Sequence, residues 1–119
     1  MRIAAIAGGW LLAAAIVGLS LAPPPPQAGG LLPDKVAHFL AYAALMFWFC
    51  VLYRRAGTRA AYGVLWIALG IALEFAQATT GYRSFELADM AANALGVLAG
   101  ALAALSLPRA GAAAEREKP

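Results

Sequence analysis

Long apolar segments alternate with short polar ones along the chain, and the polar residues gather near the ends of the apolar segments. The apolar segments cover residues 1–22, 33–53, 60–79 and 88–107. Each has the roughly 20 residues that a helix needs to cross a bilayer. In hydrocarbon, only helices and closed barrels satisfy every backbone polar group. The pattern therefore predicts an all-α integral membrane bundle of four transmembrane helices.

The first apolar segment also has features of a cleaved signal peptide, because Ser20-Leu21-Ala22 resembles the small-x-small pattern before a cleavage site. The segment is long for a signal peptide, however, and Pro23 would follow the cleaved bond. We therefore expect an uncleaved helix, followed by a proline and glycine connector at residues 23–30.

Composition agrees with a membrane protein and argues against several other classes. Hydrophobic residues make up 63% of the chain and charged residues 13%, whereas charged residues are about a quarter of a typical soluble domain. The basic residues form no stripe with interleaved aromatic residues, so we expect no nucleic-acid partner. The single cysteine, Cys50, excludes an internal disulfide and a pair of cysteine metal ligands. No soluble-cofactor motif is visible, and no cofactor is predicted.

The positions of the basic residues predict the orientation of the helices. In a four-helix topology most of them fall on one side, which has Arg2, Arg54, Arg55, Arg59, Arg109, Arg116 and Lys118. Lys35 and Arg83 fall on the other side. Because cytoplasmic loops carry an excess of lysine and arginine, we expect both termini in the cytoplasm, an N-in/C-in topology.

Polar residues on the last three predicted helices lie at a similar depth near the outer face. Asp34, His38 and Tyr42 are spaced i, i+4 and i+8, so they share one face of an otherwise apolar helix. Ionisable groups are costly inside a membrane and by default indicate a functional site. The candidate binding site comprises Asp34, Lys35, His38, Tyr42, Glu74, Gln77, Arg83, Asp89 and Asn93.

Several roles fit these residue types. Lys35 and Arg83 suit the binding of an anionic lipid head group. His38 with Asp34 or Glu74 suits general acid/base catalysis, although no serine or cysteine nucleophile lies on these faces. A metal site could use His38 with Asp34, Glu74 or Asp89, but no HExxH or similar ligand spacing supports it, so no metal is predicted. A polar network that only holds the helices together is a further alternative.

Three motifs in order along the chain resemble the VanZ-like family of bacterial membrane proteins. They are Asp-Lys-x-x-His-Phe-x-x-Tyr from residue 34, Glu-x-x-Gln from residue 74, and Arg-x5-Asp-x3-Asn-x2-Gly-x3-Gly from residue 83. The resemblance covers roughly residues 33–104. Glu86 departs from the family pattern, which has a smaller polar residue such as Ser or Asp at this position.

The resemblance implies a membrane domain at residues 33–107, between the first helix and a cytoplasmic tail at residues 108–119. It implies a multi-pass protein of the bacterial cytoplasmic (inner) membrane. We expect it to bind or modulate lipid-linked cell-wall precursors and to affect tolerance to the glycopeptide teicoplanin. Membrane lipids are the expected partners, and the sequence is also compatible with a homo-oligomer. An intramembrane enzyme acting on a lipid-linked substrate and a structural membrane subunit are the alternatives.

Overall fold

The chain folds into four helices, and the computed structural model describes residues 2–23 and 34–108. The helices are α1 (Arg2–Leu21), α2 (Asp34–Leu52), α3 (Ala56–Ala78) and α4 (Leu87–Leu105), and the described residues contain no strand. Each helix is long and apolar enough to cross a membrane. The predicted all-α fold, with four helices of membrane-spanning length and composition, is therefore confirmed.

Two predicted segments lie outside the described residues: the connector at residues 23–30 beyond Pro23, and the cytoplasmic tail beyond Pro108. The start of the third helix differs from the prediction, because α3 begins at Ala56 instead of residue 60. The basic turn before it is correspondingly short. Arg59, which the sequence pattern placed in the loop, lies in the first turns of the helix.

The position of Arg59 has a physical reason. Its Nη2 donates to the carbonyl of Cys50 at 2.6 Å, and its Nε donates to the carbonyl of Tyr53 at 2.8 Å. The last carbonyls of an α-helix have no partner within that helix. Arg59 supplies donors for the end of α2 and so closes the turn between α2 and α3.

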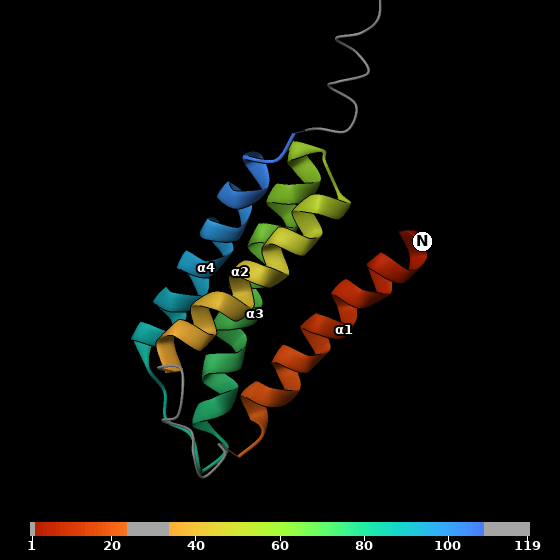
Figure 1. Ribbon diagram of the computed structural model, residues 1–119. Helices are drawn as coiled ribbons and strands as arrows, with labels where there is room; N and C mark the ends of the chain where they lie inside the picture. Colours follow the sequence, from red (N-terminus) through yellow and green to blue (C-terminus); the bar gives the residue numbers. More distant parts are fainter. Residues whose placement is uncertain (1, 24–33, 109–119) are drawn as a thin grey trace, which may run out of the picture.

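Helices α2, α3 and α4 pack together, and α1 runs along one side of them, against α2 and α3 (Figure 1). The most extensive contact is between α2 and α4. Two glycines of α4 explain how close these helices come. A Cβ at Gly96 would lie 2.3 Å from the carbonyl oxygen of Phe39, and one at Gly100 would lie 2.3 Å from that of Ala43. Gly96 and Gly100 are therefore part of the surface by which α4 contacts α2.

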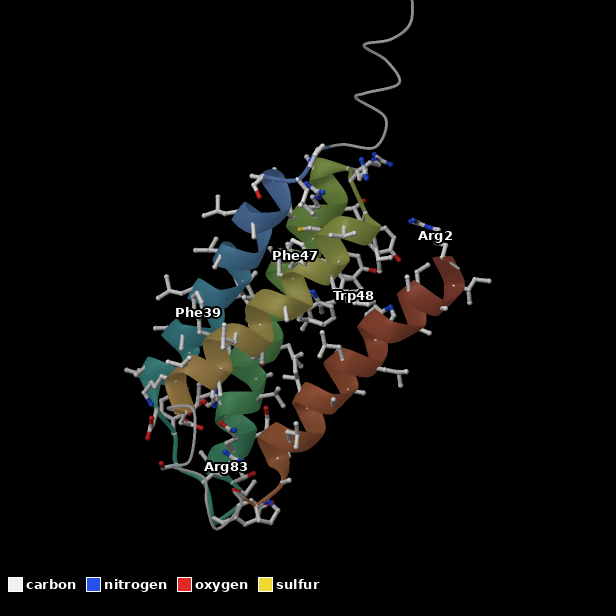
Figure 2. The ribbon with its side chains drawn as sticks, viewed as in Figure 1. Arg2, Phe39, Phe47, Trp48 and Arg83 are labelled. Atoms are coloured by element: carbon white, nitrogen blue, oxygen red, sulfur yellow. The ribbon has the colours of Figure 1, made fainter. Side chains whose placement is uncertain are left out.

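Aromatic side chains connect α1 to the other helices. Trp10 lies edge-on to the rings of Phe49 and Trp66, with centroids 5.4 Å and 5.6 Å away. Trp48, on the side of α2 that faces α1 (Figure 2), donates its Nε1 hydrogen to the carbonyl of Ala5 at 2.8 Å. These contacts hold the first half of α1 beside α2 and α3.

The two ends of the bundle differ in charge. Arg2 and Arg83 lie at opposite ends (Figure 2), and the Arg2 guanidinium lies 5.4 Å from the centre of the Tyr53 ring at the end of α2. The basic turn between α2 and α3 is therefore at the Arg2 end. The Arg83 end gathers the start of α2, the end of α3 and the start of α4, which together carry the predicted polar site.

Candidate functional site

The polar site lies at the Arg83 end of the bundle, and part of it is buried. Among the described residues, the buried polar side chains are Glu74, Gln77, Asp89 and Asn93, each 5% exposed or less. All of them belong to the predicted site. Burial of such groups requires hydrogen-bond partners, and these partners divide the predicted residues into two sets.

The first set surrounds Lys35 at the start of α2. The Lys35 ammonium donates to Asp89 Oδ1 at 2.8 Å and to the Glu86 carboxylate, so it joins α2 to α4 and to the residue before α4. Glu86 is not among the predicted site residues, because it departs from the family pattern. Its place one helical turn before Asp89 is the signal that could have included it. With two carboxylates beside it, Lys35 is largely neutralised and is not a free cation for an anionic head group.

His38 lies between Asp34 and Asn93. Its Nδ1 is 3.1 Å from Asn93 Oδ1, and its Nε2 is 3.5 Å from Asp34 Oδ2. Because an amide oxygen only accepts hydrogen bonds, the hydrogen lies on Nδ1. Asn93 therefore fixes the orientation of the imidazole and turns Nε2 toward the Asp34 carboxylate.

The second set holds the chain segments in place. Glu74 Oε1 accepts the backbone N–H of Glu86 at 2.5 Å, which fixes the start of α4 against α3. Gln77 donates to the carbonyl of Ser20 at 2.8 Å and so links α3 to the end of α1. These side chains act on backbone groups, which is the behaviour expected of structural residues.

Arg83 and its neighbour Tyr82 donate hydrogen bonds to the backbone carbonyls at the C-terminal end of α1. Arg83 donates from Nε to the carbonyl of Ala22 at 3.0 Å and from Nη2 to that of Leu19 at 3.2 Å. The Tyr82 hydroxyl donates to the carbonyl of Leu21 at 2.5 Å. Donors and positive charge are favourable at a helix C-terminus. The contribution of α1 to the site was not predicted, although the unpaired carbonyls that every helix has at its end were a signal.

Tyr42 is buried at 2% exposure, and its hydroxyl has no hydrogen-bond partner within the described part of the chain. It lines a cavity of about 230 Å³ between α1 and α2. Apolar side chains form most of the wall. The lining residues are Ile16, Leu19, Ser20, Asp34, Ala37, His38, Ala41, Tyr42 and Arg83.

A second cavity, of about 240 Å³, adjoins the first at Asp34 and Arg83. It is more polar, and its other lining residues are Gln77, Tyr82, Ser84, Glu86 and Asp89. The two cavities together lead from an apolar wall between helices to the polar end of the bundle. An apolar surface that continues into a polar one suits an amphipathic ligand.

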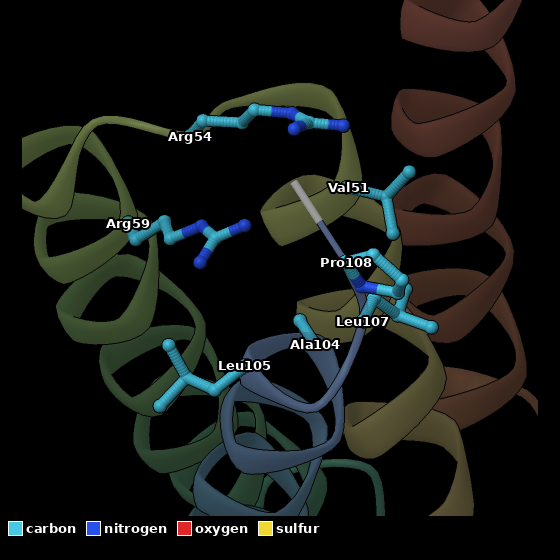
Figure 3. A pocket seen from close by; sticks show the side chains of 7 residues that line it. All are labelled: Val51, Arg54, Arg59, Ala104, Leu105, Leu107 and Pro108. Carbon is cyan, nitrogen blue, oxygen red and sulfur yellow. The ribbon is translucent and has the colours of Figure 1, made fainter. Parts of the chain in front are cut away.

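A third cavity, of about 140 Å³, lies at the opposite end (Figure 3). Arg54 and Arg59 line it with the apolar end of α4, and its lining contains no carboxylate. Arg59 is already engaged with the carbonyls that end α2. This cavity is therefore part of the basic end, separate from the predicted site.

The polar site has a formal excess of negative charge. It contains four carboxyl groups, on Asp34, Glu74, Glu86 and Asp89, whereas its permanent cations are Lys35 and Arg83. Both cations already have partners, in the two acids and in the α1 carbonyls respectively. The arrangement as it stands favours a positively charged ligand over an anionic one.

A polytopic membrane protein with a polar site at one end of the bundle is the class that this fold defines. The family profile described as VanZ/LLP1 matches residues 9–108, so the chain belongs to the VanZ/LLP1 family. The match begins within α1, consistent with the packing of α1 on α2 and α3.

A relative in Schizosaccharomyces pombe, the uncharacterized protein C11E3.10, is 35% identical over 89 residues. The alignment covers 72% of this chain and 52% of the yeast protein, so the chain spans about half the length of that relative. No solved structure gives a significant match.

Proposed function

We propose that this protein binds a lipid-linked cell-wall precursor at the outer face of a bacterial cytoplasmic membrane. The observation that carries the proposal is the cavity between α1 and α2. Its apolar wall meets Asp34, His38 and Arg83 at the polar end of the bundle. A lipid has the same division between a hydrocarbon chain and a polar head.

The charge distribution supports the outer location of the site. Arg2, Arg54 and Arg55 lie at the end of the bundle away from Asp34, Asp89 and the other acids. By the positive-inside rule, the arginine end faces the cytoplasm, which gives the N-in/C-in topology and an outer polar site. A precursor displayed on the outer leaflet would then reach the cavity from the lipid phase.

The proposal is tested by filling the cavity without touching its polar groups. Ala41 lines the cavity, whereas Ala44 on the same helix is exposed. We expect Ala41→Leu to reduce binding of a polyprenyl-diphosphate-linked precursor to the purified protein by more than about tenfold, as measured by native mass spectrometry. Ala44→Leu adds the same side chain to the outside of α2 and should bind as the wild type does. Equal binding by both variants would show that the precursor does not bind in this cavity.

Tolerance to teicoplanin is the finer part of the proposal and is tested separately. Wild type, Ala41→Leu and Ala44→Leu are expressed at matched membrane levels in a teicoplanin-sensitive host. Protection by wild type and Ala44→Leu, but not by Ala41→Leu, is the expected result. If the host stays fully sensitive with all three proteins, the protein does not confer teicoplanin tolerance. The binding measurement still tests independently whether it binds the lipid-linked precursor.

An enzyme acting on a lipid-linked substrate is the second candidate, and one observation favours it. Nε2 of His38 faces the Asp34 carboxylate at 3.5 Å, next to the cavity, which is an arrangement suited to general acid/base chemistry. Chromatography of the precursor after incubation with the protein distinguishes the two. A product formed by wild type and absent with His38→Ala would establish the enzyme; intact precursor would exclude it.

A structural membrane subunit, the remaining alternative, makes a different prediction. Under it, Ala41→Leu would change neither lipid binding nor the amount of folded protein. Substitutions of Glu74 and Gln77 would lower that amount, because these residues hold backbone segments together.

A further inference from the structure

Three side chains that can bind a metal ion converge at the polar end of the bundle. Asp34 and His38 lie one turn apart on α2, and Asp89 comes from the first turn of α4. One ligand atom from each of them lies within 4.8 Å of the other two. The spacing along the sequence does not reveal this group, because it requires α2 and α4 to pack side by side.

The imidazole of His38 is oriented as a metal ligand is. Its Nδ1–H is directed at Asn93 Oδ1, which leaves Nε2 facing the Asp34 carboxylate. Metal-binding histidines usually donate their other ring hydrogen to such an oxygen acceptor. At 3.5 Å from the Asp34 carboxylate, Nε2 is placed to share either a proton or a metal ion with it, so this contact is compatible with a cation at this position.

Charge balance points to the same conclusion. Even without Glu74, which serves as a buried hydrogen-bond acceptor, the three carboxyl groups of Asp34, Glu86 and Asp89 outnumber the two permanent cations of the site, so an added cation is favoured. The buried and unpartnered hydroxyl of Tyr42 lies on the cavity that Asp34 and His38 also line. A polar group in this condition indicates that the cavity receives a polar ligand or ordered water.

We propose that Asp34, His38 and Asp89 bind a divalent first-row transition-metal cation of the kind represented by Mn²⁺ and Zn²⁺. Imidazole suits such cations better than it suits Mg²⁺ or Ca²⁺, which prefer oxygen ligands alone. With metal–ligand bonds of about 2.0–2.2 Å, the ligand atoms of a tetrahedral site lie about 3.4 Å apart. The 3.5 Å between His38 Nε2 and Asp34 Oδ2 already has this value, and the group as a whole, within 4.8 Å, would contract around the cation.

Lys35 does not exclude this cation. Its ammonium takes Oδ1 of Asp89, so Oδ2 is the oxygen that serves as ligand, and Glu86 shares the Lys35 charge. Three protein ligands leave coordination positions open, and Asp34 lines both cavities of the site. On the proposed lipid-binding function, a phosphate oxygen of the precursor would fill one of these positions, which explains how a site rich in acids accepts an anionic head group.

The test uses the full chain in detergent, freed of any affinity tag and treated with a chelator. Mn²⁺ is titrated into the protein while the electron paramagnetic resonance signal of free Mn²⁺ is recorded, and Zn²⁺ is then added as a competitor. We expect saturable binding of about one Mn²⁺ per chain, displaced by Zn²⁺ but not by equal Mg²⁺. Asp34→Asn and His38→Gln should each weaken binding by more than about tenfold.

Leu87→Gln is the matched control, because Leu87 is exposed in the first turn of α4 and lines neither cavity of the site. Its affinity for Mn²⁺ should stay within about threefold of wild type. The Asp34 side chain is 60% exposed, so Asp34→Asn should fold normally, and circular dichroism verifies this. Equal weakening by Asp34→Asn and Leu87→Gln, or the lack of saturable binding, would overturn the site. Because no lipid is present, this result is independent of the precursor-binding measurement.

Discussion

At the scale of single residues, Glu74 illustrates how a buried acid acts in this bundle. Its side chain is 1% exposed, and its Oε1 accepts the N–H of Glu86, the residue that precedes the first turn of α4. The first N–H groups of a helix have no partner within the helix, and a side-chain acceptor commonly serves them. The position therefore requires an acceptor oxygen and not a negative charge.

We expect Glu74→Ala to lower the free energy of unfolding by about 1–3 kcal/mol, the usual cost of leaving a buried group unpaired. Glu74→Gln keeps an oxygen at the same place and should lie much closer to the wild type. Unfolding of the purified protein in detergent, followed by circular dichroism, measures both variants. If the glutamine variant is as unstable as the alanine variant, then the charge of Glu74 contributes and the hydrogen bond alone is not enough.

Local spacing predicted some contacts of the site and could not predict others. Asp34 and His38 are four residues apart on one helix, so their proximity follows from helix geometry. Lys35 and Glu86 are separated by 51 positions, and their contact depends on how the loop before α4 is folded. Helix periodicity carries no information about such a loop. For this reason the sequence placed Lys35 near phosphate, whereas the structure places it between two carboxylates.

At the scale of helices, the contact between α2 and α4 depends on two glycines. The absence of a side chain at Gly96 and Gly100 lets the backbone of α4 approach that of α2 closely enough to exclude a Cβ. Small residues at such spacing are how membrane helices obtain close van der Waals contact. This contact also sets the distance between Asp89 on α4 and His38 on α2.

Gly96→Ala should lower the free energy of unfolding by about 1–3 kcal/mol, because the added methyl meets the backbone oxygen of Phe39 and not a movable side chain. Gly18→Ala is the control, since nothing lies within 4 Å of a Cβ there. Alanine is favoured over glycine within helices by up to about 1 kcal/mol, so this variant should be as stable as wild type or more so. Thermal unfolding in detergent compares the two. Similar stability for both would mean that α4 can shift away from α2 without cost.

The helices themselves were predictable from hydropathy, but their ends were not all predictable. Arg59 is charged, so the sequence pattern assigned it to the loop. In the structure it belongs to α3 and donates to carbonyls of Cys50 and Tyr53. A charged residue near a membrane surface can continue a helix when its side chain pairs with backbone groups of the neighbouring helix. That pairing is a tertiary contact and is absent from any local pattern.

At the scale of the whole molecule, the chain is polarised from end to end. Arg54 and Arg59 line the cavity at one end (Figure 3), and Asp34 and Asp89 line the cavity at the other. Under the proposed topology the polar site faces outward, because the positive-inside rule favours a cytoplasmic location for the arginine end. The proposed precursor and cation would both reach the site from the outer face.

Thiol labelling tests this orientation directly. The chain has one cysteine, Cys50, which is buried, so Cys50→Ala provides a background without reactive thiols. A cysteine is then introduced at Ser84, before α4, or at Ala56, at the start of α3; both positions are exposed. In intact cells, a membrane-impermeant maleimide should label Ser84→Cys, whereas Ala56→Cys should react only after the membrane is permeabilised. The reverse pattern would place the acidic end in the cytoplasm and would exclude a precursor on the outer leaflet as the ligand.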